Sequence, residues 1–377
     1  MLSLNSVNSH SVVLTMHLKL RKFLFAVWLI GTIILAVTST SFATEPIFPS
    51  EKNAPPPRII RTCCSFGADV EMAALPFIKI SDITSREAIG NHVYLGDKQE
   101  GNGIIYTKRG GFIDLGHLRD CADWTAYLYR QIISKNLEDE FVLNLGNEAG
   151  NKTLTIKAFK PDSLPNPYEL ASKIAYDLSL WHEIATWYGA SYIPMVPERY
   201  SSFSPEDLFS NLLGTYLGKK ALQSSLPYNE AMTFYITEML DSLESVETYD
   251  ETYNAMEKVV NVWWTDEERL PSKKVLLMRY FDCSDNVCLE PWTVEPIDNI
   301  FSILKPSQDL SNDYSLSINL NYKVPNKSGV RSDGSKVISQ FDFDRLINYA
   351  EYEIWLMEEK YKQTRHILLK KNDKQAD

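Results

Sequence analysis

The chain has 377 residues, of which 44% are hydrophobic and 23% are charged. This length accommodates two average domains or one large one, and the apolar share is sufficient for a sizeable core. The formal net charge of −11 argues against nucleic acid as a partner, because phosphate binding requires a basic face. The same charge disfavours adhesion to anionic membranes.

The N-terminal segment has the pattern of a secretory signal peptide. A basic stretch at residues 19–22 precedes an uncharged apolar run over residues 23–37, and small residues follow up to Ala43. The run is shorter than the roughly 20 residues that cross a bilayer. We therefore expect a leader over residues 1–43, with Met16 as an alternative start, and an exported protein without a stable membrane span.

The remaining sequence predicts an α+β protein, a helix-rich single domain with several short β-hairpins. Residues 44–57 are proline-rich and are expected to form an extended linker. Residues 58–370 show no internal repeat and no boundary, so we expect them to form the domain. A polar tail occupies residues 371–377.

The first chemistry-bearing stretch follows a predicted hairpin whose turn contains a glycine pair. Apolar residues at 104–106 and 112–113 flank that turn, and a helix is predicted from Leu115 to Ile133. His117 and Asp120 share one face of it, so Asp120 is expected to accept the second N–H of the imidazole and to orient it. In the alternative interpretation, Asp120 only complements the helix N-terminus.

The clearest predicted helix starts after Asn166 and ends at Gly189. Asn166 is a favoured N-cap, Pro167 fits the first helical position, and Glu169 is placed to complete a capping box. The last three turns of this helix contain few polar residues, so most of their circumference should be buried.

His182 and Glu183 lie in that apolar part of the helix. A buried ionised glutamate is costly unless a cation or a proton meets it, and the candidates are Arg109, Arg119 or a metal ion. Burial would raise the pKa of Glu183, as a general acid or base requires. A buried salt bridge that only fixes packing is the alternative.

The His-Glu pair invites comparison with the His-Glu-x-x-His helix of zinc peptidases. The fifth position is Thr186 here, so His117 would have to replace the missing histidine. A third ligand, Asp207, lies in a segment (206–211) that loosely resembles the downstream helix of thermolysin-like peptidases. Zinc bound by His117, His182 and Asp207 is therefore the predicted cofactor site. The alternative is that Ser204, Glu206 and Asp207 simply start a helix.

The other predicted elements and cysteine pairings are as follows. Small residues at four-residue spacing, which allow close helix packing, occur at Ser210, Gly214 and Gly218. Further helices are predicted over residues 228–264 and 343–369, and further strands over 58–67, 275–281, 287–294 and 314–324. Export permits disulfides, and the expected pairs are Cys283 with Cys288, and Cys63 or Cys64 with Cys121. A Cys121–His117 nucleophile pair is the weaker alternative.

Four stretches together resemble a bacterial exported family, domain of unknown function 4056. They are residues 61–67 (Arg-Thr-Cys-Cys-Ser-Phe-Gly), residues 101–107 (Gly-Asn-Gly-Ile-Ile-Tyr-Thr), residues 109–120, and residues 181–189 (Trp-His-Glu followed by Thr-Trp-Tyr-Gly). The resemblance covers roughly residues 58–300. It implies an envelope or secreted protein of Gram-negative type, in the periplasm or outside the cell, and brings no established activity.

These observations lead to two functional hypotheses. The first is an exported hydrolase of envelope or host material, with Glu183 as general acid or base and His117 and His182 as metal ligands or proton carriers. In it Asp120 orients His117, and Arg109 or Arg119 is the electrophilic partner. The second is a non-catalytic binding protein in which the same residues form a buried structural network.

Overall fold

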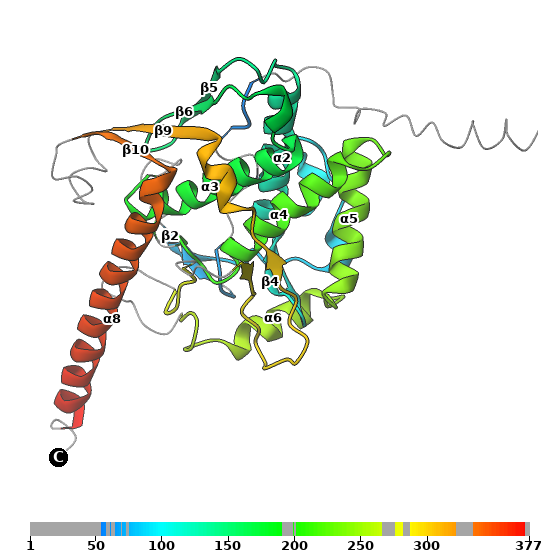
Figure 1. The fold of residues 1–377 in the computed structure, drawn as a ribbon. Helices are drawn as coiled ribbons and strands as arrows, with labels where there is room; N and C mark the ends of the chain where they lie inside the picture. The colour runs from blue at the N-terminus through cyan, green and yellow to red at the C-terminus, as the bar shows by residue number, and fades with distance from the viewer. Residues whose placement is uncertain are drawn as a thin grey trace, which may run out of the picture. The chain divides into compact units, whose positions relative to one another are not determined.

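Three helices, α2 (Leu115–Ile133), α3 (Pro167–Trp187) and α4 (Asp207–Leu222), pack against one another and provide most of the functional residues (Figure 1). The computed structural model describes part of the chain, namely residues 54–57, 61, 65–68, 70–72, 75–190, 199, 201–265, 276–281, 287–321 and 335–373. Helices and small antiparallel sheets within it confirm the predicted α+β class.

Glycines allow α2 and α4 to approach each other closely. A Cβ atom on Gly214 would lie 2.1 Å from the carbonyl oxygen of Leu118, and one on Gly218 would lie 2.8 Å from the Cα of Ala122. The third small residue of this face, Ser210, accepts a hydrogen bond from a backbone N–H at the end of strand β4 (2.9 Å). The predicted small-residue packing face is confirmed.

The starts of α3 and α4 differ in how their first N–H groups are satisfied. The side chain of Asn166 caps α3, as predicted, by accepting from the N–H groups of Tyr168 and Glu169. The Glu169 carboxylate does not complete a capping box but accepts from Lys219 of α4 at 3.0 Å. A helix does start at Asp207, as the composition of residues 204–207 indicated, but the N-cap residue of α4, Glu206, makes no side-chain capping bond.

A hairpin leads directly into α2. Strands β3 (Ile104–Thr107) and β4 (Gly111–Asp114) form the predicted antiparallel hairpin, with Thr107 opposite Gly111. The helix begins immediately after β4, so Asp114 ends the strand and also caps α2 through its side chain. This continuity fixes the first turn of α2, which carries His117.

A four-stranded antiparallel sheet, in the order β10-β9-β6-β5, contains the second predicted hairpin. Its strands are β5 (Phe141–Asn147), β6 (Gly150–Ile156), β9 (Tyr314–Leu320) and β10 (Val337–Ser339). Two small pairs are β1 (Val70–Met72) with β2 (Leu75–Ile80), and β7 (Cys288–Leu289) with β8 (Ile303–Leu304). The predicted strand over 314–324 is confirmed in its described part.

The C-terminal predictions were partly wrong. The single helix predicted over residues 228–264 is two helices, α5 (Tyr228–Ser242) and α6 (Tyr249–Lys258), because the chain turns between them with Glu244 at φ +55°. Residues 276–281 form no strand, and within 287–294 the strand is limited to Cys288–Leu289. The last helix, α8 (Phe343–Asp373), extends slightly beyond its predicted end.

Cys121 and Cys288 are free thiols, so the predicted disulfides that involve them do not form in this structure. Cys288 is exposed on the short strand β7, and Cys121 donates to the side-chain oxygen of Asn211 (3.2 Å) inside the protein. Cys63, Cys64 and Cys283, and the predicted leader, lie outside the described residues. Among the helices that are described, none has the length and apolar character needed to cross a membrane.

Candidate metal centre

Two histidines from neighbouring helices face each other. His117 is on α2 and His182 is on α3, and their ring centroids are 6.0 Å apart at an interplanar angle of 77°. Nδ1 of His117 lies 2.7 Å from Oδ1 of Asp207, and Nδ1 of His182 lies 2.7 Å from Oε1 of Glu148. The His182–Glu148 contact is a hydrogen bond, and the His117–Asp207 contact has ion-pair distance. In carboxylate–histidine–metal sites a carboxylate on Nδ1 orients the ring, and Nε2 is then the ligand atom.

Glu183 supplies the third group of this centre. Its side chain is 1% exposed, and one carboxylate oxygen accepts the backbone N–H of Phe203 at 2.7 Å. The other oxygen, Oε1, has no hydrogen-bond partner among the described residues. Ligand atoms of His117, His182 and Glu183 all lie within 4.8 Å of one another, so the two helices converge as the sequence requires for a common site.

Burial of the carboxyl raises the pKa of Glu183 to about 8, with a further contribution from the Asp207 charge and an opposing one from the two imidazoles. Glu206 behaves similarly: it is 1% exposed, and burial together with Asp207 raises its pKa well above the usual range. Asp114 belongs to the same acidic region, and its ligand oxygen lies within 4.8 Å of those of His117 and Asp207. This concentration of buried acids favours a bound cation or protons.

A small cavity of about 50 Å³ opens beside the two imidazoles. It has room for a few water molecules, since one water needs roughly 10–15 Å³ of such volume. Its walls are formed by α2, α3 and α4 together with the β5–β6 hairpin. The lining residues are Arg61, His117, Asp120, Cys121, Trp124, Glu148, Lys152, Ala175, Leu178, Ser179, His182 and Asn211.

The hairpin contributes an ion pair to this cavity. The ammonium of Lys152 lies 2.8 Å from Oε2 of Glu148, and both side chains are almost fully buried. Glu148 thus accepts from Lys152 with one oxygen and faces His182 with the other. The Lys152 ammonium also lies 5.4 Å from the centre of the Trp124 ring.

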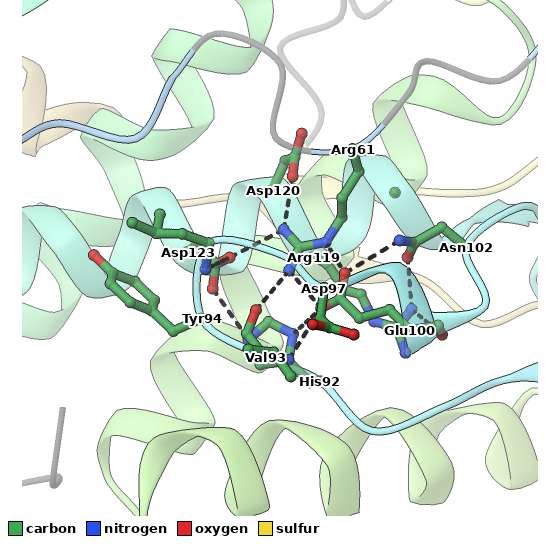
Figure 2. A network of polar contacts seen from close by, with 12 residues as sticks. Arg61, His92, Val93, Tyr94, Asp97, Glu100, Asn102, Arg119, Asp120 and Asp123 are labelled. Atoms are coloured by element: carbon green, nitrogen blue, oxygen red, sulfur yellow. Dashed lines mark hydrogen bonds and ion pairs between the residues drawn. The ribbon is translucent and has the colours of Figure 1, made fainter. Parts of the chain in front are cut away.

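Asp120 lines the cavity but does not contact His117 in the expected way. Figure 2 shows its carboxylate directed at the guanidinium of Arg61, 2.7 Å away. Burial raises the pKa of Asp120 to about 6, although Arg61 opposes the shift. The partner of His117 is Asp207 instead, because the start of α4 lies against the first turn of α2.

Arg61 lines the cavity and is the centre of a buried network of polar contacts (Figure 2). Its guanidinium contacts Glu100 through Nε and Nη2, both at 2.7 Å, and Asp123 through Nη1 at 3.0 Å. Nε2 of His92 lies 3.1 Å from the second oxygen of Asp123. This cluster is a buried His/Glu/Arg/Asp network, and apart from Asp120 its members are not residues that the sequence proposed for the site.

Neither predicted electrophilic arginine contacts the candidate metal centre. Arg109 donates to the backbone oxygens of Asn299 and Ser242 at the protein surface. Arg119 is buried but donates to the backbone oxygens of Glu100 and Gly90. The guanidinium of each arginine donates to backbone carbonyl oxygens of nearby segments, and neither arginine contacts Glu183.

Cys121 lines the cavity, yet its environment opposes a nucleophilic role. Burial raises the pKa of the thiol well above its usual range, although the His117 charge acts against the shift. A thiol of raised pKa supplies little thiolate, which is the reactive form.

Sequence reasoning missed three residues of the site: Arg61, Glu148 and Lys152. Glu148 lies in the turn of the predicted β5–β6 hairpin, and Lys152 follows on β6. The hairpin itself was recognisable, but no pattern linked it to the helices. Arg61 lies in a motif used for the family resemblance, which was the only signal that pointed to it.

Fold and site together define an α+β protein with a buried histidine–carboxylate centre between three helices. The chain belongs to the family described as "Protein of unknown function (DUF4056)", whose sequence profile matches residues 51–292, which confirms the resemblance. Neither a curated protein nor a solved structure matches the chain. The matched region contains all the residues of this centre, namely His117, Glu148, His182, Glu183 and Asp207.

Proposed function

We propose that this protein is a metal-dependent hydrolase in which His117, His182 and Glu183 bind one divalent cation. The observation that carries the proposal is the grouping of their ligand atoms within 4.8 Å, with a carboxylate on Nδ1 of each imidazole. Two histidines and one glutamate are a ligand set of catalytic zinc sites, which keep a position open for water. Zinc is therefore the preferred ion.

The buried acids support a cation at this position. An ionised Glu183 would leave the buried Oε1 without a hydrogen-bond partner and close to the Asp207 carboxylate, and that costs several kcal/mol unless a cation is present. As a ligand, Glu183 takes over the role that the sequence assigned to Asp207. Asp207 instead orients His117, and Glu148 orients His182.

The cavity gives the proposed metal access to water. When bound, a zinc ion would supply a water molecule whose pKa is lowered towards neutrality. Asp120 is the proposed general base, because it lines the same cavity as both imidazoles. Its pKa of about 6 matches proton transfer near neutral pH.

Metal analysis of the purified full chain tests the metal centre. We expect about one zinc per chain, as in mononuclear sites, and loss of zinc in H182A and in E183A after reconstitution with zinc. His92→Gln is the matched control, because His92 is a buried histidine on a carboxylate outside the centre. A folded wild-type protein that binds no divalent cation would refute the proposal.

A non-catalytic binding protein is the second candidate, favoured by the buried ion pairs of Arg61, which give Asp120 a structural partner. The two candidates differ in Asp120→Asn, which should keep zinc in both cases. Hydrolysis of p-nitrophenyl acetate or p-nitrophenyl phosphate by the wild type, lost in D120N, supports the hydrolase. A zinc-bound wild type without turnover on these or on envelope material supports the second candidate.

Export is part of the proposal and is supported by the leader pattern over residues 1–43. Expression of the full chain in a Gram-negative host tests it by N-terminal sequencing of the periplasmic and secreted protein. The expected first residue is Thr44. Full-length protein confined to the cytoplasm would contradict export without affecting the metal centre.

A further inference from the structure

The ammonium of Lys152 is placed where a substrate group would meet it. Lys152 is 3% exposed and lines the same cavity as His117 and His182. A lysine ammonium has three donor hydrogens, and among the described residues one acceptor, Oε2 of Glu148, is within hydrogen-bond distance. The ammonium also lies 5.4 Å from the centre of the Trp124 ring. Because one of its three donor hydrogens is used by Glu148, the ammonium can still donate to an acceptor that enters the cavity.

The other cation of the cavity has no such capacity. Arg61 is engaged by Glu100, Asp120 and Asp123, and its remaining donor reaches the backbone oxygen of Val93. Lys152 is therefore the cavity cation that is able to bind an incoming group.

We propose that Lys152 and the metal centre together bind a phosphate group, and that the substrate of this site is a phosphate ester. This inference rests on the proposed function. A fixed cation beside a dication favours a group that is negative already in the ground state, as phosphate is, and an ester or amide carbonyl becomes charged only in the transition state. The cavity of about 50 Å³ has room for the phosphate group of such a substrate, and the alcohol part of the ester would remain outside.

Lys173 provides a matched control for Lys152. It is also 3% exposed and also pairs with an acid four residues away, Asp177, at 2.5 Å. It does not line the cavity. Replacement of either lysine by methionine removes a buried ammonium from an ion pair, but only the replacement of Lys152 changes the lining of the cavity.

Isothermal titration of the zinc-reconstituted full chain with inorganic phosphate tests the inference, with zinc content measured on the same samples. We expect wild type and K173M to bind phosphate, and K152M to keep its zinc but bind phosphate about tenfold more weakly or worse, the loss expected for a hydrogen bond to a charged group. Lys152→Gln replaces K152M if the latter does not fold.

Equal phosphate binding by K152M and K173M overturns the inference, as does a zinc-bound wild type that binds no phosphate. Acetate is the comparison ligand, and binding of acetate as tight as that of phosphate overturns the assignment to phosphate esters. Absence of zinc from every sample refutes the proposed function separately. Phosphate binding that is lost only in K152M would then still support the anion site.

Discussion

Nδ1 of His117 and Oδ1 of Asp207 lie 2.7 Å apart although they belong to the first turns of two different helices. Their distance is set by the packing of α2 on α4, which depends on glycines in α4. The orientation of one imidazole is thus coupled to the close approach of two helix backbones. The same coupling explains why Asp207 is buried at a helix start, where acids are usually solvated.

Removal of the Asp207 charge should weaken metal binding. In Asp207→Asn the negative charge 2.7 Å from Nδ1 of His117 is lost, so the imidazole is a less basic ligand and the expected loss of zinc affinity is about 10- to 100-fold. Glu148→Gln should have a comparable effect through His182. Competition with a zinc chelator measures both affinities, and Glu169→Gln, which alters a contact with Lys219 elsewhere on α3, should leave them unchanged.

The close helix contact predicts an unusual result for a Gly→Ala substitution. In an unhindered helix, Gly→Ala stabilises by about 1 kcal/mol. In G214A the new Cβ would meet the carbonyl oxygen of Leu118 at 2.1 Å, so α2 and α4 must separate and the protein should lose about 1–3 kcal/mol, as in overpacked cores. G218A, with a contact at 2.8 Å, should cost less. Chemical denaturation measures both, and stabilisation of G214A would show that the helices are not in tight contact.

The parts of the fold that the sequence predicted are those controlled by local signals. The bounds of α2 follow from a strand–turn–strand pattern that ends at Asp114, and the start of α3 follows from Asn166 and Pro167. The break between α5 and α6 was missed because no proline or glycine marks it. There the tertiary contacts of the turn, such as the bond from the N–H of Lys108 to the oxygen of Glu244, replace a local signal.

In the candidate site, too, the residues with a local signal were predicted and the residues brought in by tertiary packing were not. His117, His182 and Glu183 were recognisable because imidazoles and a carboxylate in apolar helix surroundings require partners. Their actual partners were not, since Glu148 comes from a hairpin turn and Asp207 from a segment that also has the composition of a helix start. Arg109 and Arg119 were wrong as partners because nearby carbonyl groups satisfy them, which a sequence does not reveal.

Arg61 should be the most important buried cation for stability. R61M would leave Glu100, Asp120 and Asp123 without the guanidinium that compensates their charges, and loss of one partner of a buried pair costs about 3–5 kcal/mol. R86M is the control, because Arg86 pairs with Asp241, which is 68% exposed. Exposed pairs contribute at most about 1 kcal/mol. Urea denaturation near neutral pH measures both, and equal losses would contradict a structural role for the Arg61 network.

Acid should destabilise the protein through Glu100. Burial acts to raise the pKa of this carboxyl, but the hydrogen bonds and charge of Arg61 outweigh it and lower the pKa from 4.5 to about 2. Between these values the unfolded state binds a proton that the folded state does not. The stabilisation is therefore fully present above pH 4.5 and is lost as the pH falls towards 2, up to about 3 kcal/mol.

The variant E100Q isolates this contribution, because the other carboxyl groups titrate in both proteins. The difference in the free energy of unfolding between wild type and E100Q should be constant above pH 4.5 and should shrink as the pH falls below that value. Urea denaturation at intervals from pH 7 to pH 2.5 measures it. Asp241→Asn, at an exposed position, should follow the wild type in parallel across the same range. A wild-type and E100Q difference that stays constant with pH would show that Arg61 does not hold Glu100 ionised.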